Sequence, residues 1–96
     1  MKRTDPQSIG ELLDKLFKSP DIAVKIAEGA LPDTWRKVVG PLVAEQTRQV
    51  RFIKGTLYVH VTSAVIRTEL MMQRAALVKA INNHTGFEIV KQVVVQ

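Results

Sequence analysis

Apolar residues recur every three or four positions through the first half of the chain, a spacing that places them on one face of an α-helix. The first stripe consists of Ile9, Leu12, Leu13, Leu16 and Phe17. Ser8 and Glu11 have the spacing of a capping box, so we predict that a helix begins at Ser8. An apolar stripe of this kind is expected to be buried against another surface.

Two more helices are predicted before residue 47. The Ser19-Pro20 pair signals the start of the second helix, and Gly29 is expected to end it in a left-handed conformation. The Pro32-Asp33 pair opens the third helix, whose apolar stripe consists of Trp35, Val38, Val39, Leu42 and Val43. We expect Gly40-Pro41 to kink or divide this helix, because proline cannot donate to the helical hydrogen-bond ladder.

At Thr47 the apolar period changes from about 3.6 residues to two, the period of a β-strand. Val50 and Phe52 alternate with Gln49, Arg51 and Ile53, and after Lys54-Gly55 the same period involves Leu57, Val59 and Val61. Because a two-residue turn ending in glycine is typical of a β-hairpin, we predict that these two strands form one.

A helical period returns at Ser63 and continues for about 20 residues, which predicts the longest helix of the chain. Its main stripe is Ile66, Leu70, Gln73, Leu77 and Ile81. Gly86 is expected to end the helix, and a final strand is expected to include Phe87, Ile89, Val93 and Val95. The predicted fold class is therefore α+β: short amino-terminal helices followed by β-β-α-β. We expect helices to pack on one face of the three-stranded sheet and leave the other open.

The composition is that of one globular domain without covalent cross-links. A chain of 96 residues supports a single hydrophobic core, so we expect one domain over residues 1–96, with a flexible segment at residues 1–7. The chain contains no cysteine, which excludes disulfides and cysteine-ligated zinc. Neither a signal-peptide pattern nor an apolar run of the roughly 20 residues that span a bilayer is present, so we expect a cytoplasmic protein without a membrane partner.

The charge is distributed unevenly. Residues 1–46 carry seven basic and seven acidic side chains, whereas residues 47–96 carry seven basic side chains and only Glu69 and Glu88 as acids. The whole net charge of +5 therefore lies in the second half, which indicates a polyanionic partner. The candidate nucleic-acid-binding residues are Arg48, Arg51, Lys54, Tyr58, His60, Arg67, Arg74 and Lys79.

Two spacings refine this prediction. Arg51, Tyr58 and His60 should share one sheet face, because alternate residues of a strand point to opposite sides, and an exposed tyrosine there can stack on a base. Arg67 and Arg74 are seven residues apart on the predicted long helix, a distance of ~10 Å along one face that suits a phosphate backbone. The alternative is a surface that only keeps the domain soluble.

Trp35 and Met71 are candidate partner-binding residues. Trp35 is either a core anchor or an exposed contact for a protein partner, since tryptophan is enriched in such contacts. Met71 offers an adaptable apolar surface, with ordinary packing as the alternative.

We predict neither a metal site nor an enzyme. His60 and His84 have no further metal ligands at suitable spacing. Phosphate-loop, dinucleotide and zinc-protease motifs are all missing, so no cofactor and no small-molecule substrate is expected.

Several motifs follow one another in a fixed order along the chain. They are Trp35-Arg-Lys-Val-Val-Gly40-Pro41-Leu42-Val43, Thr47, Gly55-Thr-Leu57-Tyr-Val59-His-Val61-Thr-Ser63-Ala64, Ile66-Arg67-Thr-Glu69-Leu70, Leu77, Ile81-Asn82, Gly86, Ile89-Val90 and Val93. This ordered series resembles the DciA-like family of small bacterial proteins over about residues 8–95. The resemblance implies a K-homology-like domain that binds the replicative helicase and helps to load it onto single-stranded DNA. The Gly-x-x-Gly loop of K-homology domains has no counterpart, since all five glycines are isolated.

Two other functions fit the same residues. The basic half can bind RNA, because stacking and phosphate contacts do not require a 2′-hydroxyl, or it can bind only an acidic protein surface. A monomer is expected.

Overall fold

A computed structural model describes residues 6–96, except for the side chains of Pro6, Gln7 and Leu16. The elements in chain order are α1 (Pro6–Lys18), α2 (Pro20–Gly29), α3 (Leu31–Gln46), β1 (Thr47–Ile53), β2 (Thr56–Val61), α4 (Ala64–Met72), α5 (Arg74–Thr85) and β3 (Gln92–Val95). The flexible segment predicted for residues 1–7 lies outside the described residues, apart from Pro6 and Gln7, which already belong to α1.

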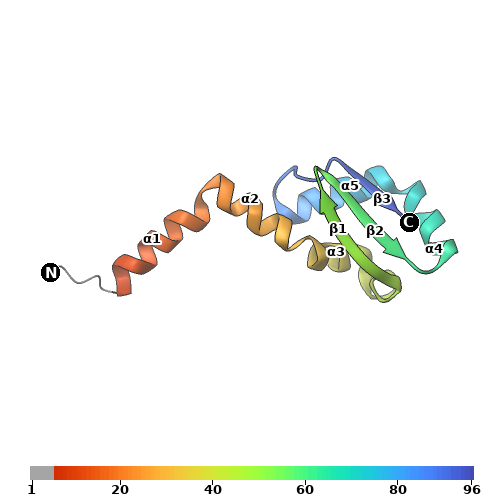
Figure 1. Cartoon of the computed structure of the whole chain (residues 1–96), viewed down its shortest axis with the longest axis horizontal. Helices are drawn as coiled ribbons and strands as arrows, with labels where there is room; N and C mark the ends of the chain where they lie inside the picture. The colour runs from red at the N-terminus through yellow and green to blue at the C-terminus, as the bar shows by residue number, and fades with distance from the viewer. Residues whose placement is uncertain (1–5) are drawn as a thin grey trace.

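The three strands form one mixed sheet in the order β1-β2-β3. β1 and β2 pair antiparallel, and β2 and β3 pair parallel. Helices α3, α4 and α5 lie on one side of this sheet (Figure 1). The core between helices and sheet contains Leu31, Trp35, Leu57, Val59, Val61, Leu70, Leu77, Ile81, Val90, Val93 and Val95. The predicted α+β class, with helices on one sheet face, is confirmed.

The hairpin between β1 and β2 forms as predicted. Lys54 and Gly55 have φ angles of 47° and 84°, and two positive φ angles are characteristic of the tight turns that join paired strands. There is also no room for a side chain at Gly55, since a Cβ built there would lie 2.9 Å from Lys91 Cγ. The Lys91 backbone N–H donates to the Gly55 carbonyl at 2.7 Å, so the turn holds the start of β3.

Helix α3 is kinked at Gly40, where φ is 86° and ψ is 173°, as the Gly40-Pro41 pair predicts. A hydrogen-bond chain spans the kink and joins α3 to β1. Trp35 Nε1 donates to Thr47 Oγ1 at 3.0 Å, and Thr47 Oγ1 donates to the Val43 carbonyl at 2.8 Å. Trp35 is fully buried, so it is a core anchor, and its prediction as a partner-binding residue is wrong.

The single long helix predicted from Ser63 is also wrong, because α4 and α5 are separate helices divided at Gln73 (φ −107°, ψ 18°). A straight helix of 20 residues is about 30 Å long, whereas strands of four to seven residues span only about 13–23 Å. The break keeps both Leu70 and Leu77 over the sheet and leaves Gln73 exposed. Ser63, where the helical period returns, caps α4, since its Oγ accepts from the Ile66 N–H.

Three smaller predictions differ from the structure. α1 begins at Pro6 instead of Ser8, since proline is tolerated in a first helical turn. Gly29 is the last residue of α2 and is not left-handed; Ala30 (φ −89°, ψ −1°) both ends α2 and caps α3. β3 begins at Gln92 and does not include Phe87 or Ile89, because the Asn82 side chain of α5 hydrogen-bonds to the Val90 backbone. Gly86 does end α5 in a left-handed conformation (φ 81°).

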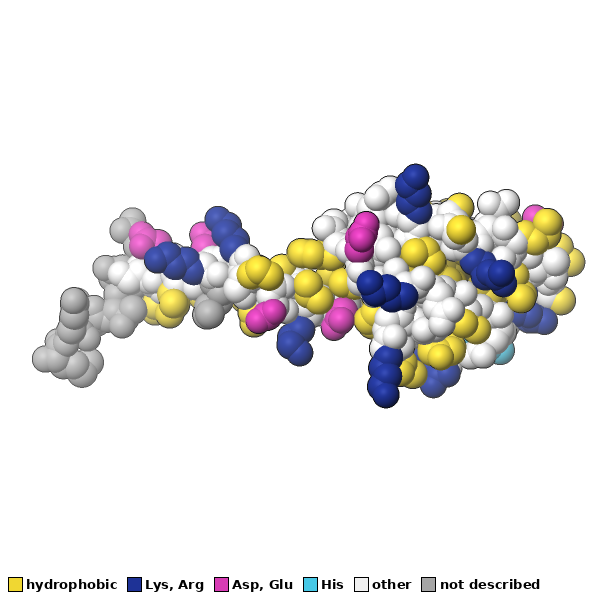
Figure 2. Space-filling view, turned by 90° about the horizontal axis from the view of Figure 1, so that it is seen from above, with side chains coloured by type: hydrophobic (Ala, Val, Ile, Leu, Met, Phe, Trp, Pro, Cys, Tyr) yellow, Lys and Arg dark blue, Asp and Glu magenta, His cyan; other side chains and the backbone are white. Residues whose placement is uncertain are grey.

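Helices α1 and α2 extend from the body as an arm, so that the molecule measures 64 × 23 × 19 Å (Figure 1). Hydrophobic side chains are visible along the surface of this arm (Figure 2). The stripe of α1 is largely solvent-exposed, with exposed fractions of 46% for Ile9, 58% for Leu12, 43% for Leu13 and 55% for Phe17. The prediction that this stripe is buried is therefore wrong, because the described part of the same chain leaves most of it exposed to solvent. No described helix has the length and apolar character required to cross a membrane.

Candidate nucleic-acid interface

The sheet face turned away from the helices carries a cluster of polar and aromatic side chains. Strand register aligns Arg51 with Tyr58 and Tyr58 with Val94 across the three strands, and Gln49 with His60 in the neighbouring row. We call this surface the open face; its residues are Gln49, Arg51, Ile53, Thr56, Tyr58, His60, Gln92 and Val94. The prediction that Arg51, Tyr58 and His60 share a face is confirmed, because the alternate residues of β2 are buried in the core and those of β1, Val50 and Phe52, are partly buried against it.

Arg51 and Tyr58 are in direct contact at the centre of the open face. The guanidinium carbon of Arg51 lies 5.7 Å from the centroid of the Tyr58 ring, within the range of a cation–π interaction. Tyr58 is half-buried and Arg51 is exposed, so the strand fixes the ring while the cation remains accessible. This arrangement offers an aromatic plane for a base and a positive charge for a phosphate.

Two further predicted cations flank the open face along β1. Arg48 is exposed at an irregularity in the register between Thr47 and Gln49, and Lys54 is exposed in the hairpin turn. Arg48 and Lys54 are six residues apart, which corresponds to about 20 Å along an extended strand.

Arg67 and Arg74 do not share a helix face, because the break at Gln73 places them on α4 and α5. Arg67 is half-buried, and its Nη1 donates to the carbonyls of Val61 (2.6 Å) and Thr62 (3.2 Å). Its guanidinium therefore joins α4 to the end of β2. Arg74 is exposed at the start of α5, beside the free edge of β3.

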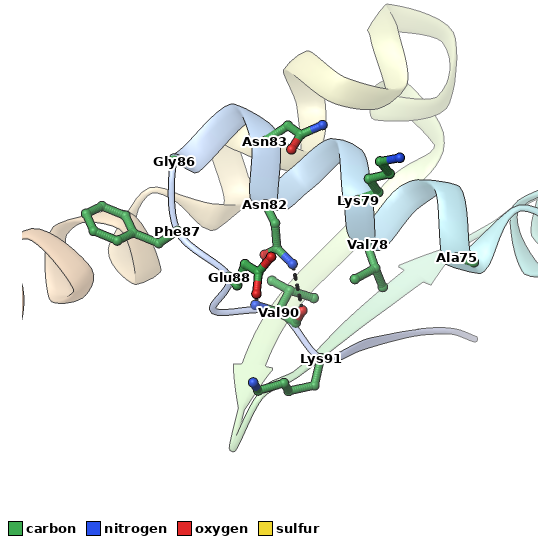
Figure 3. A pocket seen from close by; sticks show the side chains of 10 residues that line it. All are labelled: Ala75, Val78, Lys79, Asn82, Asn83, Gly86, Phe87, Glu88, Val90 and Lys91. Atoms are coloured by element: carbon green, nitrogen blue, oxygen red, sulfur yellow. Dashed lines mark hydrogen bonds between the residues drawn. The ribbon is translucent and has the colours of Figure 1, made fainter.

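A hollow of about 700 Å³ lies between α5 and residues 86–91, with Lys79 and Lys91 on opposite walls (Figure 3). The Asn82 side chain joins the two walls of this hollow. Its Nδ2 donates to the Val90 carbonyl at 2.9 Å, and the Val90 N–H donates to its Oδ1 at 3.0 Å. This pairing keeps residues 87–90 out of the sheet. Lys79 was predicted as a binding residue and Lys91 was not, although both belong to the basic second half of the sequence.

Met71, the other predicted partner-binding residue, is 46% exposed and lies near Arg74. Among the described residues, no three or more His, Asp or Glu side chains are grouped closely enough to hold a metal ion.

These features define a small α+β domain with an accessible sheet face that combines an aromatic ring with cations. The chain belongs to the DciA family: the family model described as "Dna[CI] antecedent, DciA" matches residues 8–95. The resemblance found in the sequence is thereby confirmed.

Curated relatives support the same membership. A UPF0232 protein of Mycobacterium bovis is 32% identical over 87 residues, which cover 91% of this chain and 46% of that protein. A protein of Mycolicibacterium smegmatis described as "UPF0232 protein in recF-gyrB intergenic region" is 31% identical over 86 residues, covering 90% of this chain and 44% of the relative. The chain thus spans about half the length of these relatives. No solved structure matches it.

Proposed function

We propose that this chain is a non-enzymatic accessory factor of DNA replication that acts in the cytoplasm, binds single-stranded DNA and helps to load the replicative helicase. Membership of the DciA family supports the replication role. The observation that carries the nucleic-acid part is the contact between Arg51 and Tyr58 on a sheet face that no described helix covers. Val94 extends this row to the third strand.

The chemistry of the open face favours a single strand over a duplex. Stacking on Tyr58 requires a base whose flat face is accessible, and the bases of a duplex are already stacked on one another. Arg48 and Lys54 stand at the two ends of β1, where they can contact phosphates on either side of a base stacked at the centre.

We assign helicase binding to the exposed stripe of α1. An amphipathic helix whose apolar face meets water is typical of a protein interface, and α1 lies within the family-matched region from residue 8 onward. In residues 1–46 the basic and acidic side chains are equal in number, so this part of the chain is poorly suited to a polyanion.

Fluorescence anisotropy of a labelled oligo-dT tests the DNA assignment. Tyr58→Leu removes the stacking ring, worth ~1–3 kcal/mol per base, so its affinity should fall roughly 5- to 150-fold. Arg51→Gln should lower the slope of log K against log salt by about 0.7, the contribution of one phosphate contact. Arg36→Gln is the matched control, because Arg36 is an exposed arginine on α3, away from the open face.

An equal effect of Arg36→Gln, or wild-type binding by Tyr58→Leu, would rule out the open face as the site. The same titration with oligo-U tests the RNA alternative.

A second experiment tests the helicase assignment. The wild-type chain and the double variant Leu12→Ser/Phe17→Ser are each immobilised, and the amount of purified helicase that each retains is measured. Helicase binding without any DNA binding would identify a pure protein-interaction module, and an unaffected double variant would exclude the α1 stripe.

A further inference from the structure

Among the described residues, strand β3 is at one edge of the sheet, and its hydrogen bonds show which of its backbone groups do not pair with β2. The Gln96 N–H donates to the Val59 carbonyl, the Val61 N–H donates to the Gln96 carbonyl, and the Gln92 N–H donates to the Gly55 carbonyl. Even-numbered residues of β3 therefore turn their backbone groups toward β2. Since these groups alternate along a strand, Val93 and Val95 direct their N–H and C=O groups away from β2. The two residues are only 3% and 7% exposed, so side chains that line the edge must move aside before another strand can pair with them.

Beside this free edge runs a hollow of about 380 Å³, which we call the edge groove. One wall is built from Met71, Arg74, Ala75 and Val78 of α4 and α5, and the other is Lys91–Val95. A groove between a free strand edge and a helix is suited to an extended peptide, which adds to the sheet as a new strand. The peptide gains affinity from main-chain hydrogen bonds and specificity from alternate side chains that enter the groove.

The lining of the edge groove favours a peptide over nucleic acid. None of the described residues that line it is aromatic, so a base entering it would find no ring to stack on, unlike on the open face. The side chains of Met71, Ala75 and Val78 instead offer an apolar wall for aliphatic residues.

The charges beside the groove specify the kind of peptide. Arg74 and Lys91 line the edge groove. Lys79 and Lys91 line the adjoining hollow, where Glu88 is the one acidic residue among the described lining residues. A segment that alternates acidic and aliphatic residues matches this pattern, because its aliphatic side chains face the wall while its carboxylates approach the cations.

We propose that the edge groove binds an extended acidic segment of a partner protein, which pairs with Val93 and Val95 as a fourth strand. The proposal does not depend on DNA binding by the open face. Because β3 contributes Val94 to both surfaces, the two sites are adjacent but chemically distinct.

The test uses the intact chain and an acetylated, amidated six-residue peptide of alternating valine and glutamate. Amide hydrogen exchange followed by NMR should show at least tenfold greater protection of the Val93 and Val95 amides, with no change at Val94, whose amide already faces β2. The same peptide with lysine in place of glutamate should bind at least tenfold more weakly. A version with proline at a central valine should lose the protection, since proline cannot donate to the ladder.

A pair of variants on α5 provides the matched control. Ala75 and Ala76 are both exposed helical residues, but only Ala75 lines the edge groove. Ala75→Glu should weaken peptide binding at least tenfold, and Ala76→Glu, with the same change of charge, should leave it nearly unchanged. Both variants should keep the wild-type fold.

The proposal is overturned if the peptide binds without protecting Val93 and Val95, if the lysine peptide binds equally well, or if Ala76→Glu is as damaging as Ala75→Glu. Oligo-dT is included as a separate probe. Protection of the same two amides by oligo-dT but not by the peptide would reassign the groove to nucleic acid.

Discussion

Arg67 provides a sharp test, because its sequence-based role and its structural environment predict different outcomes. Its Nη1 donates to the carbonyls of Val61 and Thr62, at 2.6 and 3.2 Å, so removing the guanidinium should release α4 from the end of β2. Hydrogen bonds to charged groups contribute about 1.5–3 kcal/mol each, and the longer bond is exposed, so we expect Arg67→Met to lower the free energy of unfolding by about 2 kcal/mol. For a domain of this size that corresponds to roughly 8–16 °C in Tm.

Urea and thermal unfolding followed by circular dichroism measure this change. Methionine keeps an apolar stem in place of the arginine methylenes, so the variant isolates the loss of the charged group. Arg74→Met is the control: Arg74 is exposed, and its stability should stay within about 0.5 kcal/mol of wild type. An unchanged midpoint for Arg67→Met would refute the reasoning. So would wild-type stability combined with a smaller salt slope of DNA binding, because Arg67 would then contact phosphate rather than its own strand.

Two further variants probe the core and the turn. Trp35→Phe removes the indole N–H that donates to Thr47 and leaves a void, so urea unfolding should show a loss of about 1–3 kcal/mol; an unchanged midpoint would show that the bond contributes nothing. Gly55→Ala must accommodate φ 84° and a Cβ 2.9 Å from Lys91 Cγ, so it should cost at least ~1 kcal/mol and speed amide exchange at Lys91. Equal exchange in both proteins would contradict the packing of Lys91 against the turn.

Much of the local structure could be predicted from short-range signals. Capping by Ser19 and Ser63, the kink at Gly40 and the left-handed end at Gly86 all depend on residues within a few positions of each other. The alternation in β1 and β2 likewise predicted that Arg51, Tyr58 and His60 share a face.

Predictions that required knowledge of distant neighbours were less successful. The helical period continues through Gln73 without a proline or glycine, so only the length of the sheet beneath reveals that the helix must break. Trp35 has the same spacing whether its ring is buried or exposed, and its hydrogen bond to Thr47 depends on how α3 meets β1. Lys91 lines two hollows because Gly55 and Asn82 hold the segment around it.

The sequence by itself determined the order and type of most elements, the α+β class, the family and the concentration of positive charge in the second half. Periodicity, caps and charge are properties of neighbouring residues, which the chain carries into any fold. Only the tertiary structure decided that Val94 lies beside Tyr58, that β3 has a free edge facing α5, and that the α1 stripe meets solvent. These features depend on contacts between residues far apart in the chain, and no local pattern specifies which surfaces such contacts cover.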